Sequence, residues 1–139
     1  MKESIFASIV FLTLAMLACS LGSTGSDKPV SANELQAKFD KLPAGDATRG
    51  EQIFIAQPCH TCHMDLPVGP VFPGEPPLVD LAATRRSGYP ADLYLYESIV
   101  NPSAFIVEGF QSDVMPEGFG ANLTRQELAD LVAYLMTMK

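Results

Sequence analysis

The segment Cys59-His60-Thr61-Cys62-His63 constrains this chain more than any other feature, because its spacing suits one cofactor. On a helical turn, residues three and four positions apart are neighbours, so the two cysteines and the final histidine project from one side. Two thiols can then bond the vinyl-derived carbons of a porphyrin while the imidazole reaches its iron. The spacing predicts one covalently bound haem c, held by Cys59 and Cys62 and ligated by His63.

Two other uses of a Cys-x-x-Cys pair are disfavoured by the rest of the sequence. A structural zinc site requires four ligands, and the chain has no second cysteine or histidine pair beyond this motif. A thioredoxin-like site requires a βαβ context, and the sequence contains no alternating β-branched runs. Within the motif, His60 occupies a variable position and is expected to face solvent.

The N-terminus has the pattern of an export signal. An apolar run over residues 4–18 is shorter than the ~20 residues that a membrane-spanning helix requires. It ends at Ala18-Cys19, which resembles a bacterial lipoprotein signal, so we expect a signal peptide over 1–18 and lipidation of Cys19. An ordinary cleaved signal and an uncleaved anchor over 4–21 are the alternatives. Two cysteines for haem and one for lipid account for all three. The expected location is the outer, periplasmic face of the bacterial cytoplasmic membrane.

The net charge of the chain restricts the classes of partner that it can bind. Sixteen acidic against nine basic residues give a formal charge of −7, so the chain has no electrostatic basis for binding nucleic acid. Acidity favours a basic docking surface on a protein partner, with strong salt dependence. The same charge could equally serve solubility alone.

Helices are expected along the whole chain, and strands nowhere. Residues 19–45 read as a lipid-attached tether, Gly/Ser-rich over 20–28, with a short amphipathic helix within 31–42. That helix would cover the following domain or pack on a partner subunit. The domain itself spans 46–139, with helices over 47–57 (N-capped by Asp46 or Thr48), 78–86, 90–101 and 124–138. Loops are expected over 65–77 and 103–121.

The last helix has the strongest local signals. Thr124 and Glu127 form a capping box. An apolar stripe then follows at helical spacing, made of Leu128, Leu131, Val132, Leu135 and Met138.

Met115 is the candidate for the second axial ligand of the iron, in an apolar loop and followed by Pro116. The other methionines are disfavoured by position: Met1 and Met16 lie in the signal, Met64 adjoins His63, and Met136 and Met138 lie on the last predicted helix. A neutral thioether raises the reduction potential. With both axial positions filled, electron transfer remains as the function, whereas a haem enzyme or gas sensor would require an open iron.

Several motifs over residues 46–139 resemble those of class I monohaem cytochrome c. Around the Cys-x-x-Cys-His motif they are Gly50-x-x-x-Phe54, Met115-Pro116 and Leu123-Thr124-x-x-Glu127-Leu128-x-x-Leu131-x-x-Tyr134-Leu135. The resemblance implies an all-α fold of three to five helices around one haem, with the first and last helices crossing so that Gly50 and Phe54 meet Tyr134. It also implies that His63 donates to a proline carbonyl, for which Pro70 and Pro76 are both candidates.

The remaining pocket residues are less specific. Arg85 or Arg86 could hold a haem propionate, since carboxylates require donors. The aromatic residues expected to line the pocket are Tyr94, Tyr96, Phe105, Phe110 and Phe119.

Residues 94–116 resemble most closely the haem domains of membrane respiratory complexes, such as the monohaem subunit of alternative complex III and the cytochrome c domains of terminal oxidases. The resemblance implies an electron carrier in a respiratory or photosynthetic chain, not itself an enzyme, with redox proteins as partners and no small-molecule substrate. It would act as an anchored subunit of a quinol-oxidising or oxidase complex, or as a free tethered shuttle.

Overall fold

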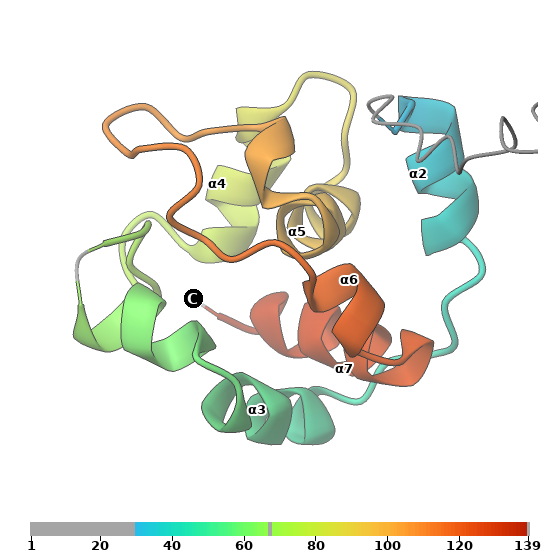
Figure 1. Ribbon diagram of the computed structural model, residues 1–139. Coiled ribbons are helices and arrows are strands. Elements are labelled where there is room, and N and C mark those ends of the chain that lie inside the picture. The colour runs from blue at the N-terminus through green and yellow to red at the C-terminus, as the bar shows by residue number, and fades with distance from the viewer. Residues whose placement is uncertain (1–29, 67, 139) are drawn as a thin grey trace, which may run out of the picture.

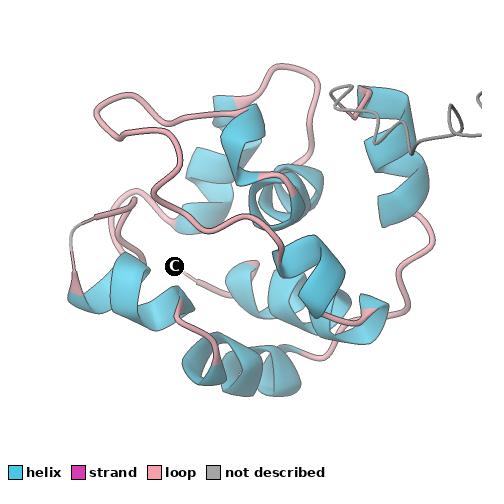
Figure 2. Ribbon diagram, in the orientation of Figure 1, coloured by secondary structure: helices cyan, strands magenta, loops and turns pink. Residues whose placement is uncertain are grey.

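A computed structural model describes residues 30–66 and 68–138, which form a cluster of helices joined by loops (Figure 1). The signal over 1–18, Cys19 and the Gly/Ser-rich segment over 20–28 lie outside the described residues. Helices are the only regular elements in the described part of the chain (Figure 2), which confirms the all-α expectation. In the ranges 30–66 and 68–138, no helix has the length and apolar character required to span a bilayer.

The first and last helices of the domain predicted over 46–139, α3 (Ala47–Ala56) and α7 (Arg125–Leu135), form the most extensive contact between helices. Gly50 makes this contact possible, because a Cβ at this position would overlap the backbone carbonyl of Asp130 and lie 2.7 Å from the Cβ of Tyr134. Phe54 also packs on Tyr134, with ring centroids 5.5 Å apart. The first and last helices of the domain therefore cross as the resemblance implied, with Gly50 and Phe54 against Tyr134.

Helices α4 (Leu78–Arg85) and α5 (Ala91–Val100) pack on each other, and α5 also contacts α7. The stripe predicted on the last helix is buried throughout, with its five side chains between 2% and 6% exposed. Seven of the ten residues of α5 are buried, among them a charged residue, Glu97. The core therefore lies between α3, α5 and α7.

Helix α2 (Ala32–Phe39) lies against α5. Leu35 is 2% exposed, and the ring of Phe39 lies 5.5 Å from that of Tyr96. The sequence left two possibilities for this segment, and in the structure α2 packs on the following domain through α5.

Local signals set most helix boundaries. Asp46, rather than Thr48, caps α3 by accepting from the backbone N–H groups of Thr48 and Arg49. The capping box of Thr124 and Glu127 is present at α7. The predicted loop over 103–121 is wrong at both ends, because a 3₁₀ turn spans Pro102–Ala104 and α6 spans Phe119–Asn122. Gly118 permits α6 to begin, since its φ of +105° is a conformation that glycine readily adopts.

Candidate haem site

An apolar cavity lies beside the Cys-x-x-Cys-His turn, between α5, α7 and the loop over 105–116. Its empty space, including the part continuous with solvent, is about 1190 Å³. Cys59, Cys62, His63 and Met115 all line this cavity. Most of the helical side chains of its wall are apolar or aromatic, among them Phe54, Leu78, Tyr94, Leu95, Ile99, Leu131 and Leu135. Arg85 and Ser98 are the polar side chains that α4 and α5 add to the wall.

The imidazole of His63 is held in one orientation. Its Nδ1 lies 2.8 Å from the carbonyl oxygen of Pro70, and since a carbonyl can only accept, Nδ1 carries the proton. The ring stacks on Phe72, with centroids 4.6 Å apart and planes 27° apart, and a Cβ at Gly69 would lie 3.2 Å from its Cε1. The unprotonated Nε2 is thus the nitrogen free to bind iron.

Pro70 and Pro76 were equal candidates for this carbonyl, and Pro70 is the one within bonding distance. Pro76 does not line the cavity. Burial lowers the pKa of His63, while the bond to Pro70 acts in the opposite direction. The neutral imidazole, the form that binds metal, is therefore the form favoured by the site.

The two cysteines are half-buried free thiols. Pro58 follows the end of α3, and the motif then forms a new turn that widens into a π-helix over Thr61–Asp65. The ordinary helical turn assumed from the spacing is therefore replaced by a wider one around His63, a feature frequent at functional sites. Burial raises the pKa of the Cys59 thiol, so the protonated form is favoured before attachment.

His60 differs from its expected position. It is half-buried rather than solvent-facing, and its Nδ1 is buried without a hydrogen-bond partner among the described residues. Its Nε2 lies 3.9 Å from a carboxylate oxygen of Asp65. The π-helical turn brings these two side chains together.

Among the methionines in the described part of the chain, Met115 alone lines the cavity. Met64 is 47% exposed and Met138 is buried in the core. The loop that carries Met115 is closed at its base by a hydrogen bond that the sequence did not indicate, from Ser103 Oγ to Glu117 Oε1 at 2.6 Å. Gly120 packs closely on α5 in the same region, because a Cβ added to it would lie 3.0 Å from the Cβ of Val100.

Residues 47–139 match the family model of cytochrome c. The chain belongs to the cytochrome c family. No curated protein and no solved structure gave a match. Members of this family bind haem c covalently and transfer electrons with it, so haem c is the cofactor of this chain. An apolar cavity bordered by two free thiols, an oriented neutral imidazole and a thioether fits that cofactor.

The two neighbouring arginines of this cytochrome c have different surroundings. Arg85 lines the haem cavity, and its Nη1 lies 3.5 Å from the hydroxyl of Tyr94. Arg86 lies outside the cavity lining, where it forms an ion pair of 2.6 Å with Glu97 and stacks over Tyr89. Arg85 is therefore the arginine available to a haem propionate.

Four of the five aromatic residues expected in the haem pocket line the cavity. Tyr96 does not, because it lies on the opposite face of α5 from Tyr94 and packs against Phe39 of α2. Residues two positions apart on a helix do not share a face, which explains the difference.

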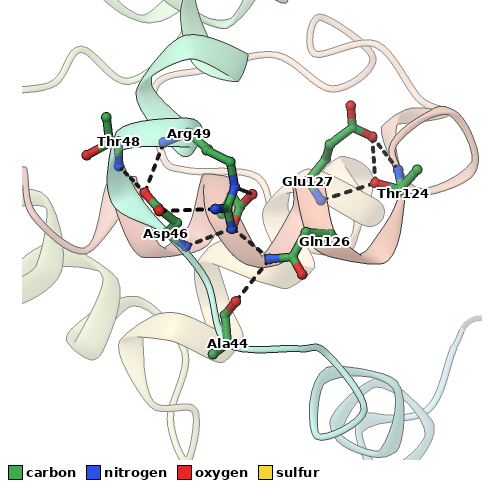
Figure 3. A network of polar contacts seen from close by, with 8 residues as sticks. Ala44, Asp46, Thr48, Arg49, Thr124, Gln126 and Glu127 are labelled. Atoms are coloured by element: carbon green, nitrogen blue, oxygen red, sulfur yellow. Dashed lines mark hydrogen bonds and ion pairs between the residues drawn. The ribbon is translucent and has the colours of Figure 1, made fainter.

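Sequence reasoning missed a buried polar network at the α3–α7 crossing (Figure 3). Asp130 is 1% exposed, and its carboxylate accepts hydrogen bonds from the backbone N–H of Asp46 and the side chains of Arg49 and Gln126. Gln126 also donates to the carbonyl of Ala44. The signal was a charged residue in the middle of the apolar sequence Leu128–Val132.

Proposed function

We propose that this cytochrome c is a one-electron carrier whose haem iron is ligated by His63 and Met115. The observation that carries the proposal is that both side chains line one cavity while the Nδ1 of His63 is bound to Pro70. Such a bond fixes the orientation and basicity of a metal-binding histidine. With two protein ligands on the iron, no position is left for a small molecule, and electron transfer is the chemistry that remains.

Cys59 and Cys62 are the proposed points of covalent attachment, one thioether each. Cys59→Ala and Cys62→Ala should each leave a single thioether, measured as haem that stays on the chain in a denaturing gel. His63→Ala should abolish the low-spin spectrum. An unchanged spectrum in His63→Ala would refute the proposed ligation.

Met115 separates a carrier from a haem enzyme or gas sensor. Met115→Leu keeps the side-chain volume but removes the sulfur, so the far-red methionine-to-ferric-iron band should vanish, carbon monoxide should bind and the reduction potential should fall. Met136→Leu, which changes a methionine outside the cavity lining, is the matched control and should keep the band. If Met115→Leu keeps it as well, or if the wild-type protein is high-spin, the carrier proposal fails.

We further propose that the domain acts at the outer face of the bacterial cytoplasmic membrane, anchored through a lipid on Cys19. The apolar run over 4–18 and the Ala18-Cys19 junction support this. The resemblance of residues 94–116 to haem domains of respiratory complexes supports a role as a subunit of a quinol-oxidising or oxidase complex, with a free tethered shuttle as the alternative.

The anchor and the complex are tested separately. Mass spectrometry of the mature N-terminus should find an acylated Cys19, and Cys19→Ala should release haem-loaded protein or stall processing. A chain that begins at Ser20 or later without acyl mass contradicts the anchor. Purification from native membranes should bring integral redox subunits with the wild-type protein, whereas recovery of the cytochrome alone favours the shuttle.

A further inference from the structure

The N-terminal part of the described chain is fixed to the haem domain at the end that carries α2. Helix α2 packs on α5, and the residues that follow it contact α7. Gln126 Nε2 donates to the carbonyl of Ala44 at 3.0 Å, and a Cβ at Gly45 would overlap the backbone carbonyl of Ala129. Any anchor attached before α2, which begins at Ala32, therefore holds the domain by this end.

Two exposed cations lie next to each other at this end. Arg125 Nη1 lies 3.4 Å from the carbonyl oxygen of Lys41, and both residues are exposed. Neither forms an ion pair with a residue that the structure describes, in contrast to Lys38, Arg49 and Arg86. Arg85 lines the haem cavity. Within the described chain, Lys41 and Arg125 are thus the exposed cations available to an external anion.

Most of the negative charge lies elsewhere. Residues 50–123 contain nine acidic and two basic residues, whereas residues 30–49 and 124–138 contain five acidic and four basic ones. Four of these five carboxylates are engaged by a cation or by the cap of α7, namely Glu34, Asp46, Asp130 and Glu127. Glu108 and Asp113, in contrast, are exposed on the loop over 105–116, at the opposite end from α2 (Figure 1). The α2 end is therefore the end that an anionic surface repels least.

A lipid on Cys19 would bring this end of the domain to a bilayer. The 11 residues from Ser20 to Val30 reach at most roughly 36 Å when fully extended. The surface of an anionic bilayer attracts nearby lysine and arginine, and the attraction falls off within a Debye length of about 8 Å at physiological ionic strength. An anchor before α2 brings the two cations into this range more readily than it brings the acidic loop.

We propose that Lys41 and Arg125 form a contact site for the phosphate groups of anionic phospholipids. Together with the anchor, this contact holds the domain with α2 toward the bilayer. The loop over 105–116, whose exposed residues line the haem cavity, then faces the aqueous side. The proposal rests on the lipid anchor of the proposed function.

The test measures how fast single side chains are modified in the haem-loaded full chain, held on vesicles by its own lipid. The N-hydroxysuccinimide ester of acetic acid modifies Lys41, a carbodiimide with glycine ethyl ester modifies Glu108, and mass spectrometry quantifies both products. At low salt, phosphatidylglycerol added to phosphatidylcholine should slow modification of Lys41 on the order of fivefold and leave Glu108 unchanged. Equal slowing at both residues would overturn the proposal, because the domain would then have no preferred side.

Variants at position 125 separate charge from local structure. Arg125→Gln removes one cation and should restore most of the modification of Lys41 on the anionic vesicles. Arg125→Lys keeps the charge and should keep the protection. Loss of protection in both variants would assign it to the hydrogen bond from Arg125 to the Lys41 carbonyl and overturn the lipid contact.

Ser112→Asp is the control for net charge, because it makes the same change in charge as Arg125→Gln but on the exposed loop over 105–116. Lys41 should stay protected in this variant. If Ser112→Asp restores the modification of Lys41 as fully as Arg125→Gln does, net charge alone governs the orientation and the contact site is refuted.

Failure of the anchor and failure of the contact site give different results. A chain that carries no acyl group and leaves the vesicles contradicts the anchor, and the contact site is then measured in the same way with Ser23→Cys coupled to a maleimide phospholipid. Protection of Lys41 in native membranes but not on phosphatidylglycerol vesicles would overturn the lipid contact and assign the site to a membrane protein. Sedimentation of the Cys19→Ala protein should give a monomer, and a dimer that Arg125→Gln dissociates would assign the site to a second copy of the chain.

Discussion

The guanidinium of Arg49 binds both carboxylate oxygens of Asp130, with Nε 2.8 Å from Oδ2 and Nη2 3.0 Å from Oδ1. The bond joins α3 to α7 across 81 residues of sequence. The same carboxylate accepts from the backbone N–H of Asp46 at 2.7 Å, at the residue that caps α3. Asp130 therefore fixes where α3 begins as well as where it crosses α7.

Removal of this carboxylate should destabilise the domain. Asp130→Ala leaves donors from three residues without their acceptor at a partly buried place, which should lower the free energy of unfolding by about 2 kcal/mol. The measurement is chemical denaturation of the haem-loaded protein. Asp40→Ala, which removes an exposed carboxylate bonded to Gln36, is the control and should change stability little. A similar loss in both variants would contradict the role of the network.

The network also predicts an acid-dependent stability. The hydrogen bond from Arg49 is the largest cause that holds the pKa of Asp130 below its usual value. A lowered pKa in the folded state stabilises the protein fully above the unfolded value of about 3.9, and this stabilisation is lost as the pH falls through the lowered folded value. Asp130→Asn should therefore flatten the acid side of the stability–pH curve. An unchanged slope below about pH 4 would contradict the assignment.

Gly50→Ala tests the close approach of α3 and α7. Alanine is the better helix former by up to about 1 kcal/mol, but its Cβ would overlap the carbonyl of Asp130. The overlap should outweigh the gain in helix propensity, so that the free energy of unfolding falls by about 1–3 kcal/mol in total. Gly74→Ala is the control, because its nearest neighbour, the Val71 carbonyl oxygen, lies 4.0 Å from the Cβ position. A stabilised Gly50→Ala variant would show that the helices can separate freely.

The adjacent arginines should respond differently to the same substitution. Arg85→Gln removes a cation from the haem cavity, which favours the ferric state and should lower the reduction potential by roughly 20–60 mV. Arg86→Gln should shift the potential less, but should destabilise the fold by about 2–4 kcal/mol near neutral pH, because it leaves the buried Glu97 without its partner. Voltammetry and denaturation of both variants separate the two roles. Interchanged effects would assign the propionate contact to Arg86.

Helix α2 should stabilise the haem domain without affecting the haem. Leu35→Ala removes a side chain that is 2% exposed and should lower the free energy of unfolding by about 2–3 kcal/mol. The visible spectrum should stay unchanged, because Leu35 does not line the haem cavity. Ile55→Ala, at a position 59% exposed on α3, is the control. A spectral change in Leu35→Ala would show that α2 acts on the site as well.

Local signals predicted most of the fold. Prolines, caps and one apolar stripe were sufficient for α3, α4, α5 and α7, because each signal acts within a few residues of its helix. The short α6 was missed, since it depends on the backbone of Gly118 and on packing of Gly120 against Val100. The π-helical turn at His63 was missed for a similar reason, because no residue in the motif distinguishes it from an ordinary helical turn.

The candidate site also contains some residues that the sequence could identify and others that only the structure reveals. Spacing singled out the residues of the Cys-x-x-Cys-His motif and exclusion singled out Met115, and all of Cys59, Cys62, His63 and Met115 line the cavity. Ligation of the iron by His63 and Met115 stays a prediction. The sequence could not decide whether Pro70 or Pro76 provides the carbonyl that binds His63, because the choice depends on the path of a proline-rich loop. Nor could Asp130 be paired with Arg49, since the partners lie far apart in sequence and only the crossing of α3 and α7 brings them together.

That crossing has a consequence for the biogenesis of the protein. The attachment motif follows α3 directly, and α3 has its main contact with α7, the last helix to emerge during synthesis. Until residues 125–135 have been synthesised, α3 lacks its main packing partner and the motif adjoins a helix that is not yet packed. Closure of α7 over α3 then completes the packing of the helix that leads into the motif.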